Sequence, residues 1–190
     1  MGFIEMPKPD TAIVGKRDQI VAGLRTIVPG EGVITDPKQL VPYETDAFTA
    51  YRRVPLAVVL PETTEQVAAL MKFCSAHGVP VVPRGAGTSL AGGAIPQEDA
   101  VVIGLSKMRA IVSINYANRT AVVQVGITNL AVSDAVTKDG FFYAPDPSSQ
   151  LACTIGGNIA MNSRGAPCLK YGVTTNNLLC LKLVLMDGPV

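Results

Sequence analysis

The chain has 190 residues, of which 48% are hydrophobic and 16% charged, so it has enough apolar material for one folded domain with up to two lobes. Its 16 basic and 15 acidic residues leave no positive surplus for binding nucleic acid, and no apolar run reaches the roughly 18 residues of a membrane span. Because it has one histidine, four cysteines without C-x-x-C spacing and no signal-peptide pattern, we expect a cytoplasmic protein with reduced thiols and no metal site.

Residues 1–54 are predicted to form an N-terminal arm and one helix. Met1 to Lys16 has no periodicity and is expected to be extended, whereas apolar residues fall on one helical face from Arg17 to Val28. Gly32 to Arg53 is rich in turn formers and includes the polar cluster Glu44-Thr45-Asp46. We expect this last segment to cross the surface without a chemical role.

A strand, a helix and a second strand are predicted next. Leu56 to Leu60 is a short apolar run between two prolines, which suits a strand buried on both faces. A capping box at Thr63 to Gln66 begins the helix, Gly78 is placed to end it, and Val79 to Val82 forms the second strand. This order predicts a right-handed parallel crossover, and such sheets bind ligands at the carboxyl ends of their strands.

A glycine-rich loop, P-R-G-A-G-T-S-L at positions 83–90, follows that second strand. Gly85 and Gly87 allow φ > 0 and a close ligand approach, so successive N–H groups can converge on an anion such as a diphosphate. Thr88 and Ser89 add hydroxyl donors, and Arg84 adds a positive charge at the entrance. Neither the Rossmann nor the P-loop pattern is met, and a sharp turn without a ligand explains this loop equally well when it is taken alone.

The second half of the chain changes connectivity. Ala100 to Leu105 reads as a strand, and the runs 110–115 and 120–125 read as a hairpin around Tyr116 to Arg119. A helix is predicted from Thr128 to Lys138 and a last strand from Leu178 to Met186. We therefore expect an α+β fold in which residues 55–190 form two lobes, about 55–105 and about 106–190.

Ligand-type residues cluster again between that helix and the last predicted strand. Two prolines fix the backbone around Asp146, and Gly156-Gly157 begins a short helical stretch and is expected to offer free N–H groups. The alternative is an ordinary long loop, but long unstructured loops are uncommon in compact domains unless they are functional or disordered. The pattern favours a second anion clamp.

Four motifs in this order resemble one family: P-R-G-A-G-T-S-L, P-D-P-S-S-Q, C-T-I-G-G-N and C-L-K-Y-G-V-T-T. From about Ile20 to its end, the chain resembles the FAD-linked oxidases of the vanillyl-alcohol oxidase type, and within them the flavoprotein subunits of bacterial glycolate oxidases. The resemblance implies a two-lobed domain with FAD between its lobes. The implied cofactor-binding residues are Pro83, Arg84, Gly85, Ala86, Gly87, Thr88, Ser89, Leu90, Pro145, Asp146, Pro147, Ser148, Thr154, Ile155, Gly156, Gly157, Asn158, Asn162, Gly165, Tyr171 and Gly172.

The resemblance also implies a reaction. The glycolate oxidase subunits that the chain resembles dehydrogenate a 2-hydroxy acid, here glycolate, by passing a hydride from the substrate's α-carbon to FAD, with electrons moving on to a quinone or an iron–sulfur partner subunit. Such subunits could also hold the protein peripherally at a membrane. D-lactate and D-2-hydroxyglutarate dehydrogenases share the same FAD cradle and remain alternatives, as do a non-catalytic fragment and a phosphate-ligand binder without flavin.

Three departures from the family pattern shape these expectations. Thr88 stands where some relatives carry the histidine that tethers FAD covalently, so FAD is expected to be non-covalent. Ser163-Arg164-Gly165-Ala166 replaces the Ala-Gly-Gly of many similar proteins, which weakens the assignment of Gly165. The chain stops at Val190, where relatives continue through a closing segment and a substrate domain, so no catalytic residue is assigned and the isolated chain is expected to be inactive.

Overall fold

A computed structural model describes residues 6–190 as two compact units. The first unit comprises the chain up to Arg84 together with residues 89–104 and 183–190. The second comprises residues 85–88 and 105–182. Residues 85–88 of the glycine-rich loop thus belong to the second unit, although the residues on either side of them belong to the first.

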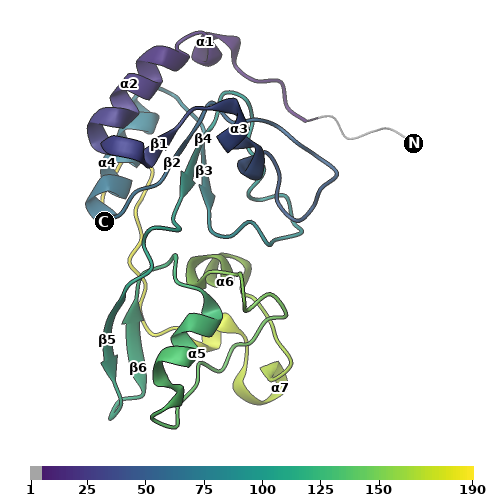
Figure 1. The fold of residues 1–190 in the computed structure, drawn as a ribbon, viewed down its shortest axis with the longest axis vertical. Helices are drawn as coiled ribbons and strands as arrows, with labels where there is room; N and C mark the ends of the chain where they lie inside the picture. Colours follow the sequence, from purple (N-terminus) through teal and green to yellow (C-terminus); the bar gives the residue numbers. More distant parts are fainter. Residues whose placement is uncertain (1–5) are drawn as a thin grey trace. The chain divides into compact units, whose positions relative to one another are not determined.

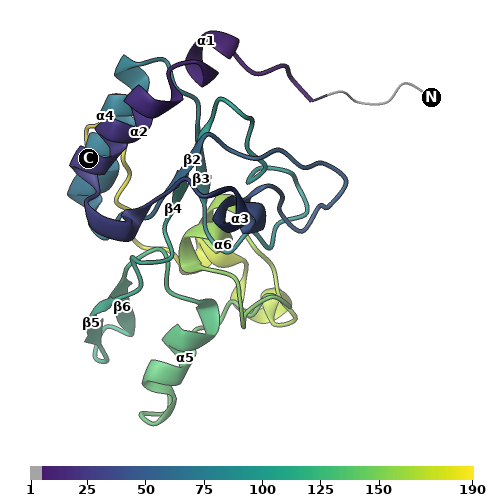
Figure 2. The same cartoon turned by 45° about the horizontal axis from the view of Figure 1, so that its top comes forward.

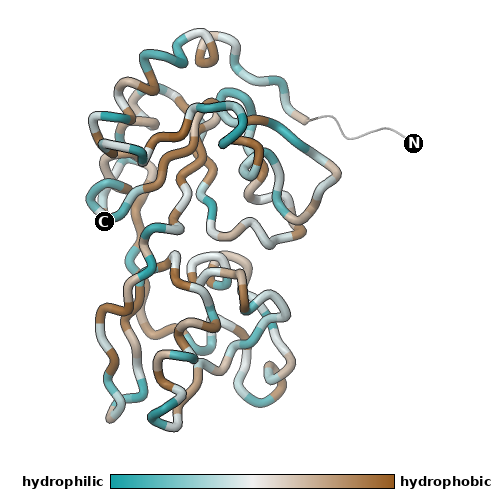
Figure 3. The backbone as a smooth tube through the Cα atoms, viewed as in Figure 1, coloured by the Kyte–Doolittle hydropathy of each residue, from teal (hydrophilic) through white to brown (hydrophobic). Residues whose placement is uncertain are grey.

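The first unit is built on a four-stranded sheet of strand order β1-β2-β4-β3 (Figures 1 and 2). The strands are β1 (Val33–Ile34), β2 (Ala57–Val59), β3 (Val81–Arg84) and β4 (Val101–Gly104). β2 and β4 are buried along their whole length, and the hydrophobic colouring is strong along this sheet in Figure 3. The prediction that Leu56 to Leu60 forms a strand buried on both faces is therefore confirmed at β2.

The predicted parallel arrangement of β2 and β3 is confirmed, but the two strands are not neighbours. Each pairs in parallel with β4, which lies between them, with Val58 and Val82 both opposite Val102. β1 adds an antiparallel edge beside β2, although it comes from a segment that the sequence predicts to be loop. β3 is consequently an edge strand that ends at Arg84, where the glycine-rich loop begins.

Two helices of this unit, α2 (Arg17–Ile27) and α4 (Thr64–Ala76), lie side by side (Figures 1 and 2). The approach is close because α2 carries Gly23 opposite the ring of Phe73, where a Cβ atom would clash. Thr63 caps α4 by accepting a hydrogen bond from Gln66 N at 3.2 Å, and Gly78 follows the helix with φ +66°. Both predicted helix ends are confirmed.

The N-terminal segment contains more structure than the sequence predicts. It contains α1 (Thr11–Val14), η1 (Gly30–Gly32), α3 (Pro37–Leu40) and η2 (Val41–Tyr43). Local capping accounts for two of them, because Asp10 accepts from Ala12 N at 2.8 Å and Asp36 accepts from Lys38 N at 2.8 Å. The extended arm predicted for residues 1–16 is therefore wrong at α1, and residues 1–5 lie outside the described part.

The second unit contains the predicted hairpin and helix. Its elements are β5 (Ile111–Asn115), β6 (Thr120–Val123), α5 (Asn129–Thr137), α6 (Ile155–Met161), α7 (Cys168–Tyr171) and η3 (Thr174–Asn177). β5 and β6 pair antiparallel, and Thr128 caps α5 by accepting from Ala131 N at 3.3 Å. A small core of Ile127, Val132 and Ile155 joins the hairpin to α5 and α6.

The strand predicted at Leu178 to Met186 is wrong. The segment has no regular secondary structure, and several of its leucines are exposed, with Leu179 at 82%. Its almost continuous apolar run, with leucines at alternate positions, fits a strand, but a strand also needs a neighbouring backbone to complete its hydrogen bonds. Among the helices of residues 6–190, none is long and apolar enough to cross a membrane.

Candidate cofactor-binding site

The glycine-rich loop follows the edge strand β3, and the backbone N–H groups at its centre are available to a ligand. In the described part of the chain, no hydrogen bond is formed by the N–H groups of residues 85–88. Gly87 has φ +71°, a conformation that a side chain would strain, and Thr88 is exposed. Four successive N–H groups without intrachain partners suit an anionic ligand, as the sequence predicts.

Gly85 is a glycine for a different reason. Its φ is not in the left-handed region, but a Cβ atom added to it would collide with Oγ1 of Thr154 and come within 3.8 Å of Gly157 N. The first motif therefore lies directly against the third motif within the second unit. The sequence predicts both motifs but gives no sign that one rests on the other.

The N-terminus of α6 differs from its prediction. Thr154 caps the helix through Oγ1, which accepts from Gly157 N at 3.2 Å. Ile155 N and Gly156 N donate to Ile127 O at 2.9 Å and to Val125 O at 2.8 Å, and Asn158 N donates to Thr154 O at 2.9 Å. The prediction of free N–H groups at Gly156-Gly157 is wrong, because Gly156 N donates to the chain before α5 and Gly157 N donates to the cap residue Thr154.

Close packing explains the glycine pair instead. A Cβ atom on Gly156 would lie 2.9 Å from Cβ of Val125, and one on Gly157 would lie 3.3 Å from Thr154 Oγ1. Small residues here let α6 approach the turn after β6 and the Thr154 cap of its own first turn. These glycines shape the surface beside Gly85 rather than supplying donors.

The second motif is held by a residue that sequence reasoning misses. Asn129, the first residue of α5, is fully buried, and its Nδ2 donates to Pro145 O at 2.9 Å. Its backbone N–H donates to Cys153 O at 3.0 Å, next to the cap residue Thr154. Asn129 therefore ties the Pro145-Asp146-Pro147 turn to the segment that begins α6. No sequence pattern distinguishes it from an ordinary polar residue in the first turn of a helix.

This cluster contains buried polar atoms without partners. Pro145 and Pro147 are buried, Ser148 is exposed, and Gly165 lies so close that its added Cβ would meet Asp146. Within residues 6–190, three buried side-chain atoms here make no hydrogen bond: Asn129 Oδ1, Asp146 Oδ1 and Asn158 Nδ2. Buried polar atoms are normally satisfied, so the structure leaves capacity for a polar ligand or water in this cluster.

The remaining predicted residues of this unit have structural contacts. Asn162 ends α6 with φ +47°, and its Oδ1 accepts from Thr175 N at 3.1 Å. Tyr171 packs edge-on against Phe142 with ring centroids 5.8 Å apart, and Gly172 follows α7 with φ +77°. These residues organise the loops around the cluster.

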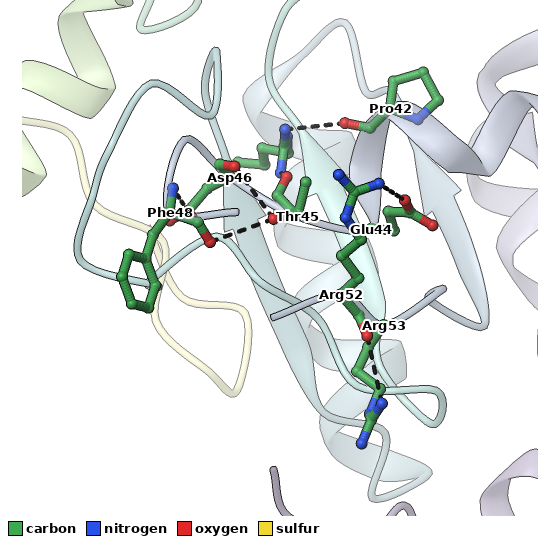
Figure 4. Close-up of polar contacts among 8 residues, drawn as sticks. Pro42, Glu44, Thr45, Asp46, Phe48, Arg52 and Arg53 are labelled. Carbon is green, nitrogen blue, oxygen red and sulfur yellow. Dashed lines mark hydrogen bonds and ion pairs between the residues drawn. The ribbon is translucent and has the colours of Figure 1, made fainter. Parts of the chain in front are cut away.

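Arg84 does not present its charge as the sequence predicts. Its side chain is buried and donates to Thr45 O at 2.7 Å, to Pro42 O at 3.0 Å and to Ala94 O at 3.2 Å; Figure 4 labels Thr45 and Pro42. Burial lowers the pKa of its guanidinium from the ordinary value, and the nearby Tyr43 and Asp46 oppose that shift. Arg84 therefore anchors the start of the loop, and its guanidinium is hydrogen-bonded to carbonyl oxygens of the first unit.

Both ends of the loop contact the segment that the sequence predicts to be a surface crossing. Asp46 is 4% exposed and accepts from Phe48 N at 2.8 Å and from Gly92 N at 3.0 Å. Ser89 O accepts from Ala47 N at 3.1 Å, whereas Leu90 is 72% exposed. The polar cluster Glu44-Thr45-Asp46 was visible in the sequence, but its target lies more than forty residues away along the chain.

Comparison with known proteins shows the family to which the chain belongs. Residues 55–190 match the model of a family described as an FAD binding domain. The chain is 48% identical over 172 residues to glycolate oxidase subunit GlcD of Escherichia coli, covering 90% of this chain and 34% of that protein. It is 34% identical over 170 residues to mitochondrial D-2-hydroxyglutarate dehydrogenase of Bos taurus, covering 90% of this chain and 31% of that protein.

Solved structures show the same fold. p-Cresol methylhydroxylase superposes with a TM-score of 0.76 at 25% identity, over 92% of this chain and 35% of that one. Alkyldihydroxyacetonephosphate synthase superposes with a TM-score of 0.75 at 22% identity, over 90% of this chain and 34% of that one. The chain spans about a third of the length of the curated relatives it matches. It belongs to the FAD binding domain family, as an α+β domain of the vanillyl-alcohol oxidase type related to glycolate oxidase subunits and other 2-hydroxy-acid dehydrogenases.

Proposed function

We propose that this chain is the FAD-binding portion of a flavin-dependent 2-hydroxy-acid dehydrogenase, with glycolate as its substrate. The observation that carries the proposal is the loop of residues 85–88, whose four N–H groups have no hydrogen-bond partner in the described part of the chain. Such a row of donors suits the diphosphate of FAD. Similarity to glycolate oxidase subunits favours glycolate over other 2-hydroxy acids.

The residues present fit FAD in two further respects. Asn129, Asp146 and Asn158 each keep a buried polar atom without a partner in residues 6–190, so the second unit has hydrogen-bonding capacity to offer a ligand. Thr88 has no ring nitrogen, so FAD is held non-covalently. By family resemblance we assign the glycine loop to the diphosphate and Pro145 to Ser148 to the flavin end.

Bound FAD would supply the oxidant, taking a hydride from the α-carbon of the 2-hydroxy acid as its hydroxyl loses a proton and the 2-oxo acid forms. The contribution of this chain is to bind and orient the cofactor. The loop amides face its negative charge, Gly85 and Gly156 let the chain segments around the site pack against Thr154 and Val125, and Asn129 fixes the turn at Pro145. We assign no residue of this chain to the removal of the hydroxyl proton.

The electron acceptor is a quinone or an iron–sulfur partner subunit. The relatives from Escherichia coli and Bacillus subtilis are each named as a subunit of glycolate oxidase, which supports a multi-subunit enzyme. D-2-hydroxyglutarate dehydrogenase, at 34% identity, and the D-lactate dehydrogenase of Archaeoglobus fulgidus, at 39% over 133 residues, support the alternative substrates.

The absorbance spectrum of the purified chain tests the proposal. The chain is incubated with excess FAD, freed of unbound flavin and scanned, and then denatured to release the cofactor. We expect about one FAD per chain, all of it released on denaturation. A folded chain that stays colourless after this treatment would refute FAD binding. Flavin that stays attached after denaturation would refute only the non-covalent assignment.

The substrate assignment needs a second assay. The FAD-loaded chain is mixed without oxygen with glycolate, D-lactate or D-2-hydroxyglutarate, and bleaching of the flavin band is followed. Faster bleaching by glycolate supports the assignment, and faster bleaching by either other acid supports that dehydrogenase instead. A loaded chain that none of the three acids bleaches behaves as the inactive FAD-binding portion that the sequence predicts, and glycolate is then supported by sequence similarity alone.

A further inference from the structure

Asp46 is a buried carboxylate whose two oxygens accept hydrogen bonds from different parts of the chain. Oδ1 accepts from Phe48 N at 2.8 Å, which is a local turn, and Oδ2 accepts from Gly92 N at 3.0 Å, which is not local. Asp46 is 4% exposed. A buried carboxylate is costly unless it is fully hydrogen-bonded, so this arrangement is specific for one placement of Gly92.

Arg84 makes the complementary contact at the other end of the loop. Its guanidinium donates to Thr45 O and Pro42 O, one and four residues before Asp46, and lies 5.6 Å from the centre of the Tyr43 ring. Ser89 O accepts from Ala47 N at 3.1 Å. The segment 42–48 therefore holds Arg84, directly before the loop, and also Ser89 and Gly92, directly after it.

Residues 85–88, between Arg84 and Ser89, are those whose N–H groups have no partner in the described part of the chain. No N–H group of residues 85–88 donates to the described part of the chain, so nothing within the loop fixes the direction of its amides. Gly92 has φ +77°, a conformation that glycine adopts readily, and its N–H donates to Asp46. The bonds that hold the two ends of the loop therefore restrain it, together with the packing of Gly85 against Thr154.

We infer that Asp46 is a positioning residue for the cofactor loop: with Arg84 it fixes the two ends of residues 85–91 and so holds the loop amides in a ligand-binding arrangement. This inference rests on the proposed function, because the ligand of the loop is FAD. Asp46 acts through Gly92 and has no assigned contact with FAD. Its removal should loosen the loop before it loosens the sheet.

The test compares Asp46→Asn with Glu44→Gln in the complete chain. Asn keeps the shape of Asp but replaces one acceptor oxygen by a donor, so one of the two amides at Phe48 and Gly92 loses its partner. Glu44 is the matched control, because it is an acid in the same segment that pairs with Arg52 at 2.9 Å and has no bond to the loop. Arg84→Lys serves as a second variant that keeps the charge but loses the planar set of donors.

Two readouts are needed. Hydrogen–deuterium exchange of the FAD-free chain reports the loop amides of residues 85–92, with β2 and α4 as internal references. FAD titration of the same proteins gives the dissociation constant and the visible flavin spectrum. We expect Asp46→Asn and Arg84→Lys to speed loop exchange and to weaken FAD binding about tenfold, with β2 and α4 unchanged. Glu44→Gln should match the wild type in both.

The possible outcomes separate the inference from the proposed function. A wild-type chain that takes up no FAD refutes the proposed function, and loop exchange that is then unchanged in both variants refutes the clamp as well. If the wild type binds FAD and Asp46→Asn binds it equally well, only the inference fails. Faster exchange throughout the first unit would assign Asp46 to general stability and would also overturn the inference.

Discussion

Replacing Gly85 by alanine tests the packing on which the candidate site depends. A Cβ atom at this position would collide with Oγ1 of Thr154, which is 5% exposed and caps α6 through Gly157 N. Overpacking of a buried contact destabilises by about 1–3 kcal/mol. If Thr154 rotates away instead, α6 loses its cap at about 1 kcal/mol.

One effect works in the opposite direction. Alanine restricts the unfolded chain and so stabilises by about 0.4–1 kcal/mol wherever the native backbone accepts it, and Gly85 is outside the left-handed region. The steric effect is larger. We therefore expect Gly85→Ala to lower the free energy of unfolding by about 1–3 kcal/mol, measured by urea denaturation with an unchanged m value.

Gly93→Ala is the matched control, because its added Cβ meets nothing within 4 Å and its φ is not in the left-handed region. It should be neutral or slightly stabilising. Thr154→Ala removes the obstructing oxygen, so Gly85→Ala should cost almost nothing in that background. Additive effects of the two substitutions, or a Gly85→Ala chain as stable as Gly93→Ala, would refute the packing argument.

Two other predictions concern buried groups. Asn129→Ala removes the donor to Pro145 O and should lower the free energy of unfolding by about 1–3 kcal/mol. The control Asn118→Ala, at an exposed position, should leave it unchanged. Equal denaturation midpoints for the two variants would contradict a stabilising role of the Asn129–Pro145 hydrogen bond. Burial raises the pKa of the Cys74 thiol from 9.0 to about 11, so the folded chain keeps a proton that the unfolded chain loses between those values. Rising pH therefore favours unfolding, and stability should fall by up to about 3 kcal/mol from pH 9 to 11 relative to Cys74→Ala, with equal pH profiles counting against the shift.

Local chemistry determined most of the secondary structure. The Thr63 and Thr128 caps, the αL glycine at position 78 and the apolar runs that became β2 and β4 all depend on residues close together in the chain. Such features can be read without knowing the fold. The ordered motifs likewise identified the family, because together they form a pattern that few proteins share.

The strand predicted at Leu178 to Met186 shows where local reasoning ends. Its alternating leucines satisfy the strand pattern, but pairing depends on whether another backbone lies alongside. The order of β2, β4 and β3 in the sheet is likewise decided by which backbones lie side by side in the folded chain. The sequence shows that the strands are parallel, and only the folded chain inserts β4 between the other two.

The candidate site divides in the same way. The sequence by itself determined that donors and glycines gather at residues 83–90 and 154–158. Only the tertiary structure decided that the α6 amides are consumed by Val125 and Ile127, that Arg84 is buried, and that Asp46 holds Gly92. The physical reason is that residue type fixes what a group can donate or accept, whereas its partner is set by segments that fold against it from far along the chain.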